Sequence, residues 1–302
     1  MNEFIEWLSS YLGIDKNPTA TIIVSLAVFC LGVIVNELVK AISRFRERRA
    51  IRELVRRNYL IFKKYLHDQS SSLSTFGSFI TLKGSPPNFN LYVKLCSALD
   101  NFREISYSSA FKAFFVGFEN FRLKGRVKRI QAFDNLYNSL SVVKGEQERM
   151  FPILLGFHKE DATMSSAVNL SMKEAFEAAT DVSVTVNEKH GDRDHQSWLK
   201  ERDGLFQTFS KGNPNDLMEV KKFLISILDF DMANGKPIAT IFNAKQFWYY
   251  QLKLHTAIED IKRLEMLVKT TSSYCRGIWE KFELTAKDLE TYYWALFNRK
   301  LV

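Results

Sequence analysis

The stretch "TATIIVSLAVFCLGVIVNELVK", Thr19 to Lys40, decides the fold because it belongs to a long apolar run. Between Lys16 and Glu37 no residue is charged, which is a run of 20 positions. At about 1.5 Å of rise per residue, a helix of that length covers roughly 30 Å, the thickness of a bilayer's hydrocarbon core. A soluble core helix is rarely apolar on every side over such a length. We therefore predict a transmembrane helix over residues 16–40.

A cleaved export signal and a buried or interfacial helix are the two alternatives to a span. A cleavable signal has positive charge before a shorter apolar stretch, and small residues at the cleavage site. Here Glu3, Glu6 and Asp15 precede Lys16, and the run ends in bulky side chains such as those of 33–35. The sequence favours a span over both alternatives.

The charges after the span indicate its orientation. Residues 40–57 include eight basic and two acidic side chains. Basic residues next to a span stay in the cytoplasm, so we expect residues 1–15 outside the membrane and the body in the cytosol. Anionic lipid headgroups attract juxtamembrane cations by about 1 kcal/mol each. The arginines expected to contact headgroups are Arg44, Arg46, Arg48 and Arg49.

The first residues, "NEFIEWLSSYL", have an amphipathic pattern. A helix would place Phe4, Leu8, Tyr11 and Leu12 on one face, with Trp7 nearby. Such a helix can rest on the outer membrane surface, and a frayed terminus is the alternative. We predict that residues 1–15 form an extracytoplasmic amphipathic segment.

The rest of the chain has helical periodicity. We expect span and stalk, residues 16–40 and 41–70, to form one helix that ends near Gln69, where "QSSSLSTFGSF" begins. Residues 71–302 then form a cytosolic helical domain. Its first two expected helices cover residues 89–123, with a kink near 107–109, and residues 126–150. A third begins at Ser171, which opens a capping box, and a fourth follows Pro214. Two C-terminal helices complete the domain, and Thr285 caps the last of them.

One region of this domain is less regular than the others. In residues 181–195 Val182, Val184 and Val186 alternate with polar residues, a pattern that allows one short strand. The fold class that fits best is nevertheless all-α: a single N-terminal transmembrane helix followed by a cytosolic helical bundle.

Composition limits the possible partners. Of the net charge of +8, residues 40–57 contribute +6 and residues 122–129 contribute +5, so the remainder is slightly acidic. This distribution argues against binding to duplex nucleic acid. The 25 phenylalanines predict a densely aromatic core, and the three isolated cysteines predict packed, reduced thiols.

The segment "RLKGRVKR" is the best candidate ligand site. Five cations in eight residues repel one another unless an anion neutralises them, and arginine can hold phosphate with two hydrogen bonds. A nucleotide or oligonucleotide would supply phosphate, whereas a solvated loop and a contact with lipid headgroups are the alternatives. The proposed anion-binding residues are Arg122, Lys124, Arg126, Lys128 and Arg129.

A second polar segment, "HGDRDH", places His190, Asp192, Asp194 and His195 close together. Imidazole and carboxylate groups can bind a divalent metal, but a metal site normally needs further ligands, and a solvated loop accounts for the segment equally well. No Walker A, GxSxG or dinucleotide motif occurs. We therefore expect no catalytic residues, no metal and no cofactor, and we expect the chain not to be an enzyme.

The span carries a polar stripe. At 100° per residue, Thr21, Ser25, Gly32 and Asn36 fall within about 80° of one another. Small and polar residues on one face let membrane helices approach closely and form hydrogen bonds. The stripe favours self-association into a homo-oligomer, in which it packs between subunits or lines a pore.

This layout resembles the single-pass membrane effectors of bacterial anti-phage systems, such as the effector of the Hailong system. The resemblance lies in the topology, with an outward N-terminus, a polar-striped span, a basic stalk and a helical body. It implies an oligomer that forms or gates an ion channel in the inner membrane when it receives a nucleotide-type signal from a partner nucleotidyltransferase. It transfers no site residues.

Three functions remain open from the sequence. The first is the oligomeric membrane effector described above. The second is a membrane-tethered scaffold without channel activity. The third is a membrane-tethered metal-dependent enzyme that uses the loop from His190 to His195.

Overall fold

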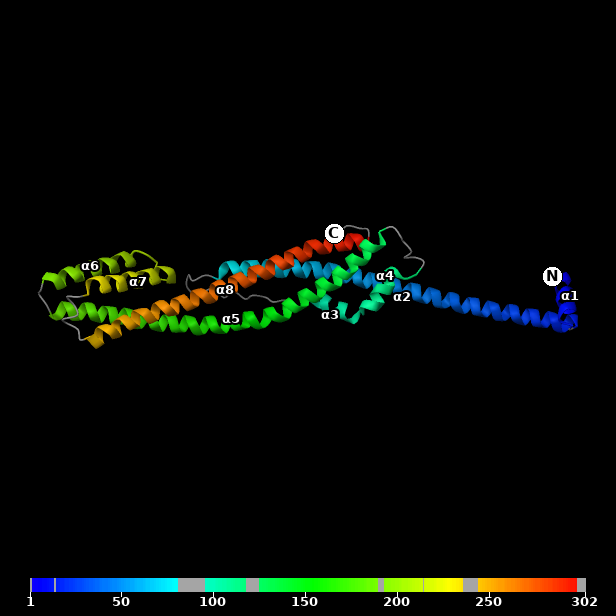
Figure 1. Ribbon diagram of the computed structural model, residues 1–302, viewed down its shortest axis with the longest axis horizontal. Coiled ribbons are helices and arrows are strands. Elements are labelled where there is room, and N and C mark those ends of the chain that lie inside the picture. Colours follow the sequence, from blue (N-terminus) through cyan, green and yellow to red (C-terminus); the bar gives the residue numbers. More distant parts are fainter. Residues whose placement is uncertain are drawn as a thin grey trace. The chain divides into compact units, whose positions relative to one another are not determined.

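A computed structural model describes residues 2–13, 15–80, 96–117, 125–189, 193–213, 215–235 and 244–297. Within these ranges the regular structure is helical and no strand is formed. The helices are α1 (Asn2–Leu12), α2 (Lys16–Phe79), α3 (Ser97–Glu104), α4 (Tyr107–Phe115), α5 (Arg126–Lys189), α6 (Arg193–Ser210), α7 (Leu217–Asn234) and α8 (Ala244–Phe297) (Figure 1). The all-α prediction is confirmed.

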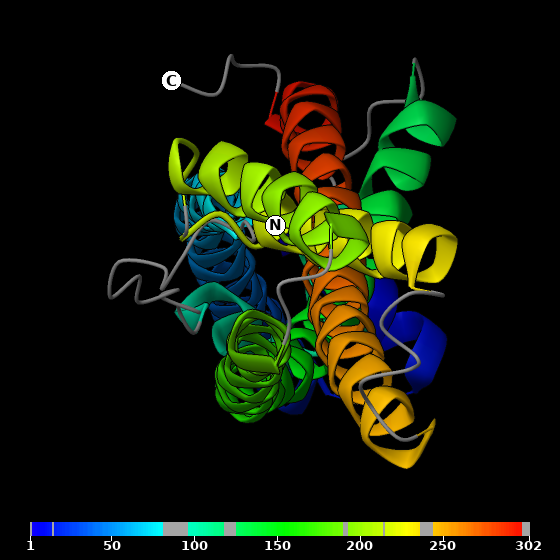
Figure 2. The same ribbon diagram turned by 90° about the vertical axis from the view of Figure 1, so that its left-hand side faces the viewer.

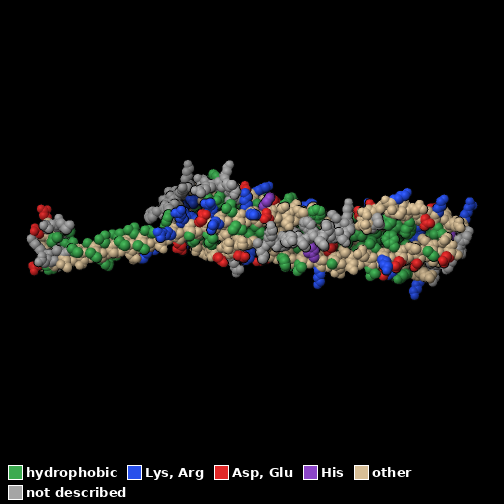
Figure 3. Space-filling model, turned by 180° about the vertical axis from the view of Figure 1, so that it is seen from behind, with side chains coloured by type: hydrophobic (Ala, Val, Ile, Leu, Met, Phe, Trp, Pro, Cys, Tyr) green, Lys and Arg blue, Asp and Glu red, His purple; other side chains and the backbone are tan. Residues whose placement is uncertain are grey.

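Helix α2 is one uninterrupted helix of 64 residues. Among the described residues it is the one helix that is long and apolar enough to cross a membrane, and none of its apolar window is buried. Figure 3 shows hydrophobic side chains along the N-terminal part of α2 and Lys and Arg side chains where that stretch ends. Because α2 continues to Phe79, the predicted end near Gln69 is wrong.

The chain divides into two compact units, and α2, α5 and α8 each contribute residues to both. The first unit comprises residues 1–62, 97–137 and 291–302. Its core is aromatic: the ring of Tyr59 contacts that of Tyr293 at 5.3 Å, and the ring of Phe114 contacts those of Phe133 at 5.8 Å and Phe297 at 5.4 Å. The phenylalanine-rich composition therefore predicted the nature of this core correctly.

The second unit comprises residues 63–96 and 138–290. Here α8 runs antiparallel to α2, because Lys63 pairs with Glu290 at 2.8 Å while Ser272 donates to the carbonyl of Gly77 at 2.8 Å. It also runs antiparallel to α5, since Lys281 pairs with Glu146 and Lys253 pairs with Glu174. Buried α8 residues recur at steps of three and four, as in a coiled coil: Tyr250, Leu254, Ala257, Ile261, Leu264, Val268, Thr271, Cys275, Ile278 and Phe282.

Helices α6 and α7 pack against each other and against one end of α5 and α8 within the second unit (Figures 1 and 2). Asp216 caps α7 by accepting a hydrogen bond from the amide of Met218 at 3.0 Å. The joint core includes Trp198 of α6, Phe223 and Ile227 of α7 and Leu254 of α8. The prediction of a helix after Pro214 is thus confirmed.

Several expected helix ends are wrong because burial on a continuous seam overrides local breaking signals. Ser171 and Thr285 are not caps: they lie inside α5 and α8 and donate to the carbonyls of Val168 and Lys281. The helix expected over 126–150 does not end there either, because α5 continues through Pro152 to Lys189. The expected kink at 107–109 is instead a break at 105–106, where Ser106 caps α4, and residues 89–95 and 118–123 lie outside the described ranges.

The short strand that residues 181–195 allowed is also wrong. Val182, Val184 and Val186 belong to α5. Val182 and Val186 are buried one helical turn apart on one face of α5, and Val184 is exposed on the opposite face.

Candidate functional site

The predicted stripe on α2 is present as an exposed row on a regular helix. Thr21, Ser25, Gly32 and Asn36 all lie in α2 and are all exposed in the single chain. A Cβ atom added at Gly32 would meet no other atom within 4 Å. Position 32 is therefore sterically open within one chain.

A basic collar follows the apolar window. The predicted headgroup residues Arg44, Arg46 and Arg49 are exposed and Arg48 is half-buried. At the end of the window the ammonium group of Lys40 lies 2.8 Å from the carboxylate of Glu37. This pair reduces the cost of placing an acidic residue beside an apolar segment. The order of apolar window, local ion pair and arginine collar suits a helix that passes from hydrocarbon into an anionic headgroup layer.

The start of α5 contains three of the five predicted anion-binding residues: Arg126, Lys128 and Arg129. Arg122 and Lys124 lie outside the described residues. The Arg129 guanidinium packs over the Phe115 ring at 5.6 Å from the centroid, whereas Lys128 is exposed and Arg126 is half-exposed.

Two features of this helix start favour an anion. The unpaired amides of a first helical turn carry partial positive charge, and the cationic side chains of Arg126 and Lys128 lie in the same turn. Gly125 precedes them with φ of 77°, a left-handed conformation that glycine adopts without strain. The arrangement can attract phosphate.

The predicted histidine loop is only partly described. Asp194 is exposed and His195 is buried in α6, so these two neighbours do not face a common solvent-accessible point. His190 and Asp192 lie outside the described residues. In the part of the chain that the structure describes, no group of three or more His, Cys, Asp or Glu side chains could hold a metal ion.

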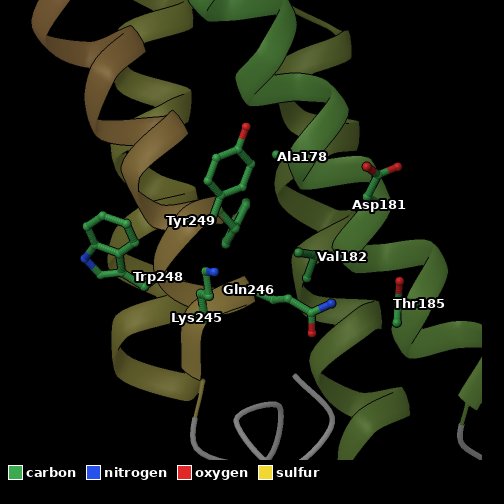
Figure 4. A pocket seen from close by; sticks show the side chains of 9 residues that line it. Ala178, Asp181, Val182, Thr185, Lys245, Gln246, Trp248 and Tyr249 are labelled. Carbon is green, nitrogen blue, oxygen red and sulfur yellow. The ribbon is translucent and has the colours of Figure 1, made fainter. Parts of the chain in front are cut away.

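Sequence reasoning missed a cleft of about 430 Å³ between α5 and α8 in the second unit. Its size falls in the range typical of small-molecule sites. In Figure 4 Gln246 and Tyr249 project from α8 toward α5, and Trp248 points to the other side of α8. The lining residues are Ala178, Asp181, Val182 and Thr185 of α5, and Lys245, Gln246, Trp248, Tyr249 and Tyr250 of α8.

A buried ion pair lies beneath this cleft. The Nε atom of Arg202 is 3.6 Å from a carboxylate oxygen of Asp231, and both side chains are fully buried. Arg202 donates to the hydroxyl of Tyr250 at 2.7 Å and to the carbonyl of Ala179 at 2.8 Å, and Tyr250 donates to Asp231. Tyr250 therefore both lines the cleft and joins the two charges.

Burial raises the pKa of the Asp231 carboxyl, and the Arg202 guanidinium and the Tyr250 hydroxyl oppose that rise. Burial also raises the pKa of Tyr250. The guanidinium additionally packs over the rings of Trp198 at 5.0 Å and Phe206 at 5.5 Å.

A sequence signal existed: Arg202 and Asp231 stand one helical turn after the apolar residues Trp198 and Ile227, at positions where the periodicity predicts another apolar residue.

Comparison with known proteins found no match. No family model matches the chain, and neither a curated protein nor a solved structure is similar to it.

Proposed function

We propose that the protein is a single-pass membrane effector of anti-phage defence. Residues 16–40 cross the bacterial inner membrane, the N-terminus lies outside, and the helical body lies in the cytosol. Several copies assemble through the body and the striped span, and together they form or gate an ion channel. A nucleotide-type signal from a partner nucleotidyltransferase activates the assembly.

One observation carries the proposal: α2 leads without a break from an exposed apolar window into a buried aromatic core. Its side chains are exposed from Val24 to Glu47 but fully buried at Val55, Tyr59 and Phe62. A continuous helix is a stiff connection, so a change in the packing around Tyr59 would move or rotate the span. This arrangement suits an effector whose cytosolic body controls a membrane segment.

Two places can receive the signal. The start of α5, with Arg126 and Lys128, offers cationic groups for phosphate. The cleft between α5 and α8 offers the ring of Tyr249 for stacking and the side chains of Asp181 and Gln246 for hydrogen bonds. We favour the start of α5, because phosphate supplies most of the binding energy of nucleic-acid ligands.

Membrane potential in living cells tests the proposal. We expect cells that express the intact chain together with its neighbouring genes to depolarise on infection. Gly32→Leu should reduce depolarisation, because the added side chain separates spans that pack through the stripe. The matched control is Ala27→Leu, which places the same bulk on the opposite face of α2.

The outcomes separate the three functions. Depolarisation that is lost in Gly32→Leu and kept in Ala27→Leu supports the channel. A chain that stays in the membrane without changing the potential, and that tolerates a poly-Leu span, is a scaffold. An activity that disappears only when His190 and His195 are both replaced by alanine indicates an enzyme. A C-terminal reporter that is active outside the cytoplasm would contradict the proposed orientation.

A further inference from the structure

Helix α1 carries an exposed ladder of three aromatic rings. The rings of Phe4 and Trp7 stack with centroids 6.1 Å apart, and those of Trp7 and Tyr11 stack at 5.7 Å. Their side chains are 56%, 60% and 77% exposed, respectively. Three large rings in one row on an 11-residue helix form an apolar surface that needs a partner.

The ladder is tethered next to the apolar window. Only three residues separate Leu12, the end of α1, from Lys16, the start of α2. The four Cα–Cα steps from Leu12 to Lys16 span at most about 14 Å when extended. The headgroup layer on each side of the hydrocarbon core is roughly 5–7 Å thick, so α1 cannot lie far beyond it. Gly13, with φ of 64°, supplies a turn between the two helices (Figure 1). If α2 spans the bilayer, α1 lies at its surface.

The chemistry of α1 identifies the partner. Tryptophan and tyrosine are enriched at the membrane interface, where an apolar ring meets a hydrated layer. The arc of the helix away from the ladder carries Glu6 and Ser9, and α1 contains no basic side chain. Attraction to anionic headgroups therefore cannot drive its binding, unlike that of the arginine collar after the span.

We propose that α1 is an interfacial anchor whose Phe4–Trp7–Tyr11 ladder inserts into the outer headgroup region by apolar and aromatic contact alone, without any need for anionic lipid. This inference rests on the proposed membrane span. The anchor fixes the depth of the outer end of α2. Its lipid partner is any bilayer with zwitterionic headgroups.

Site-directed fluorescence on the full chain tests the anchor. Cys30 is replaced by alanine, and the remaining cysteines, Cys96 and Cys275, are buried, so an environment-sensitive label reports on one added cysteine. Tyr11→Cys places the label on the ladder, and Ser9→Cys places it on the polar arc as a matched control. The protein is reconstituted into phosphatidylcholine vesicles, and quenching by aqueous iodide is measured for each label.

We expect a blue-shifted emission and protection from iodide at position 11, with free quenching at position 9, both unchanged at high salt. Equal quenching at the two positions overturns the anchor. Protection that appears only with anionic lipid, or that disappears at high salt, overturns its charge-independent mechanism. A label at Leu26→Cys distinguishes the failure of the span itself, because it is protected whenever α2 crosses the bilayer.

Discussion

At the scale of single residues, the most unusual feature of the protein is the full burial of Arg202. A buried guanidinium costs several kcal/mol of desolvation unless it is paired and hydrogen-bonded. Here the charge is compensated by Asp231, by the hydroxyl of Tyr250 and by the carbonyl of Ala179. Well-packed apolar residues can replace such a pair at little cost, so the pair is weak evidence for stability and better evidence for a specific arrangement.

Our first residue-scale prediction concerns Arg202→Met. The variant leaves Asp231 buried without its cation, which should lower the free energy of unfolding by about 3–5 kcal/mol at pH 7. Because Arg202 opposes the rise of the Asp231 pKa, its removal raises that pKa further. A raised carboxyl pKa gives stability that is present at acid pH and is lost as pH rises. The loss should therefore be smaller near pH 4, as measured by thermal unfolding in detergent.

The double variant Arg202→Met, Asp231→Asn is the control. The amide keeps the length of the Asp231 side chain and can still accept a hydrogen bond from Tyr250, but it cannot ionise. We expect it to recover part of the lost stability and to remove the added pH dependence. A pH-independent loss in the single variant would show that Arg202 acts through packing on Trp198 and Phe206.

At the scale of helices, the sequence predicted the kinds of elements better than their ends. The uncharged run and the three-and-four spacing specify helices through local geometry, so α2 and the all-α class were predictable. The helix ends were not predictable. Ser171 and Thr285 are local start signals and Pro152 is a local breaker, but all three lie inside helices whose seams are buried along tens of residues. Local periodicity marks Arg202 and Asp231 as charged residues at apolar positions, but it does not pair them. Their pairing and the cleft above Tyr250 depend on how α5, α6, α7 and α8 pack.

The second prediction concerns the start of α5. If Arg126 and Lys128 contact phosphates, replacing both with glutamine should weaken the binding of a short single-stranded oligonucleotide. The slope of log affinity against log salt concentration should fall by about 1.4, since each phosphate contact contributes roughly 0.7. Arg129 is left in place because it packs on Phe115. Fluorescence anisotropy across a salt series gives both quantities.

Lys200→Gln with Lys222→Gln is the matched control, since it removes two exposed charges from other helices. It should change neither affinity nor slope beyond a small effect of net charge. Equal weakening in both double variants would mean that the oligonucleotide responds to overall charge and that the start of α5 is not a site. Loss of binding in Tyr249→Ala alone would place the ligand in the cleft between α5 and α8.

At the scale of the whole molecule, both units bury acidic groups that ionise only at high pH. The hydroxyl oxygens of Tyr59, Tyr65 and Tyr137 are buried and have no hydrogen-bond partner among the described residues. Burial raises the pKa of Tyr59 and of Tyr65, raises that of Tyr137 to about 12, and raises that of the Cys275 thiol to about 11. The folded protein therefore holds protons that the unfolded chain releases earlier.

The sign of the effect follows from this difference. An acid whose pKa is higher in the folded state gives stability that is fully present below its unfolded pKa and is lost as pH rises toward the folded value. We expect stability to be level near neutral pH and to decline from about pH 9, where an unfolded cysteine ionises. Above about pH 10 each of the three tyrosines should add a loss of roughly 1.4 kcal/mol per pH unit. Thermal unfolding followed by circular dichroism from pH 7 to pH 11 measures the decline.

Tyrosine-to-phenylalanine variants assign the decline to particular groups. Because the hydroxyl of Tyr137 has no hydrogen-bond partner among the described residues, Tyr137→Phe loses no hydrogen bond there and should keep or slightly raise stability at pH 7. It should remove one tyrosine's share of the slope above pH 10, and adding Tyr59→Phe and Tyr65→Phe should remove the rest of the tyrosine contribution. If the triple variant declines as steeply as the native chain, alkaline unfolding has another origin, such as the loss of surface ion pairs when lysines deprotonate.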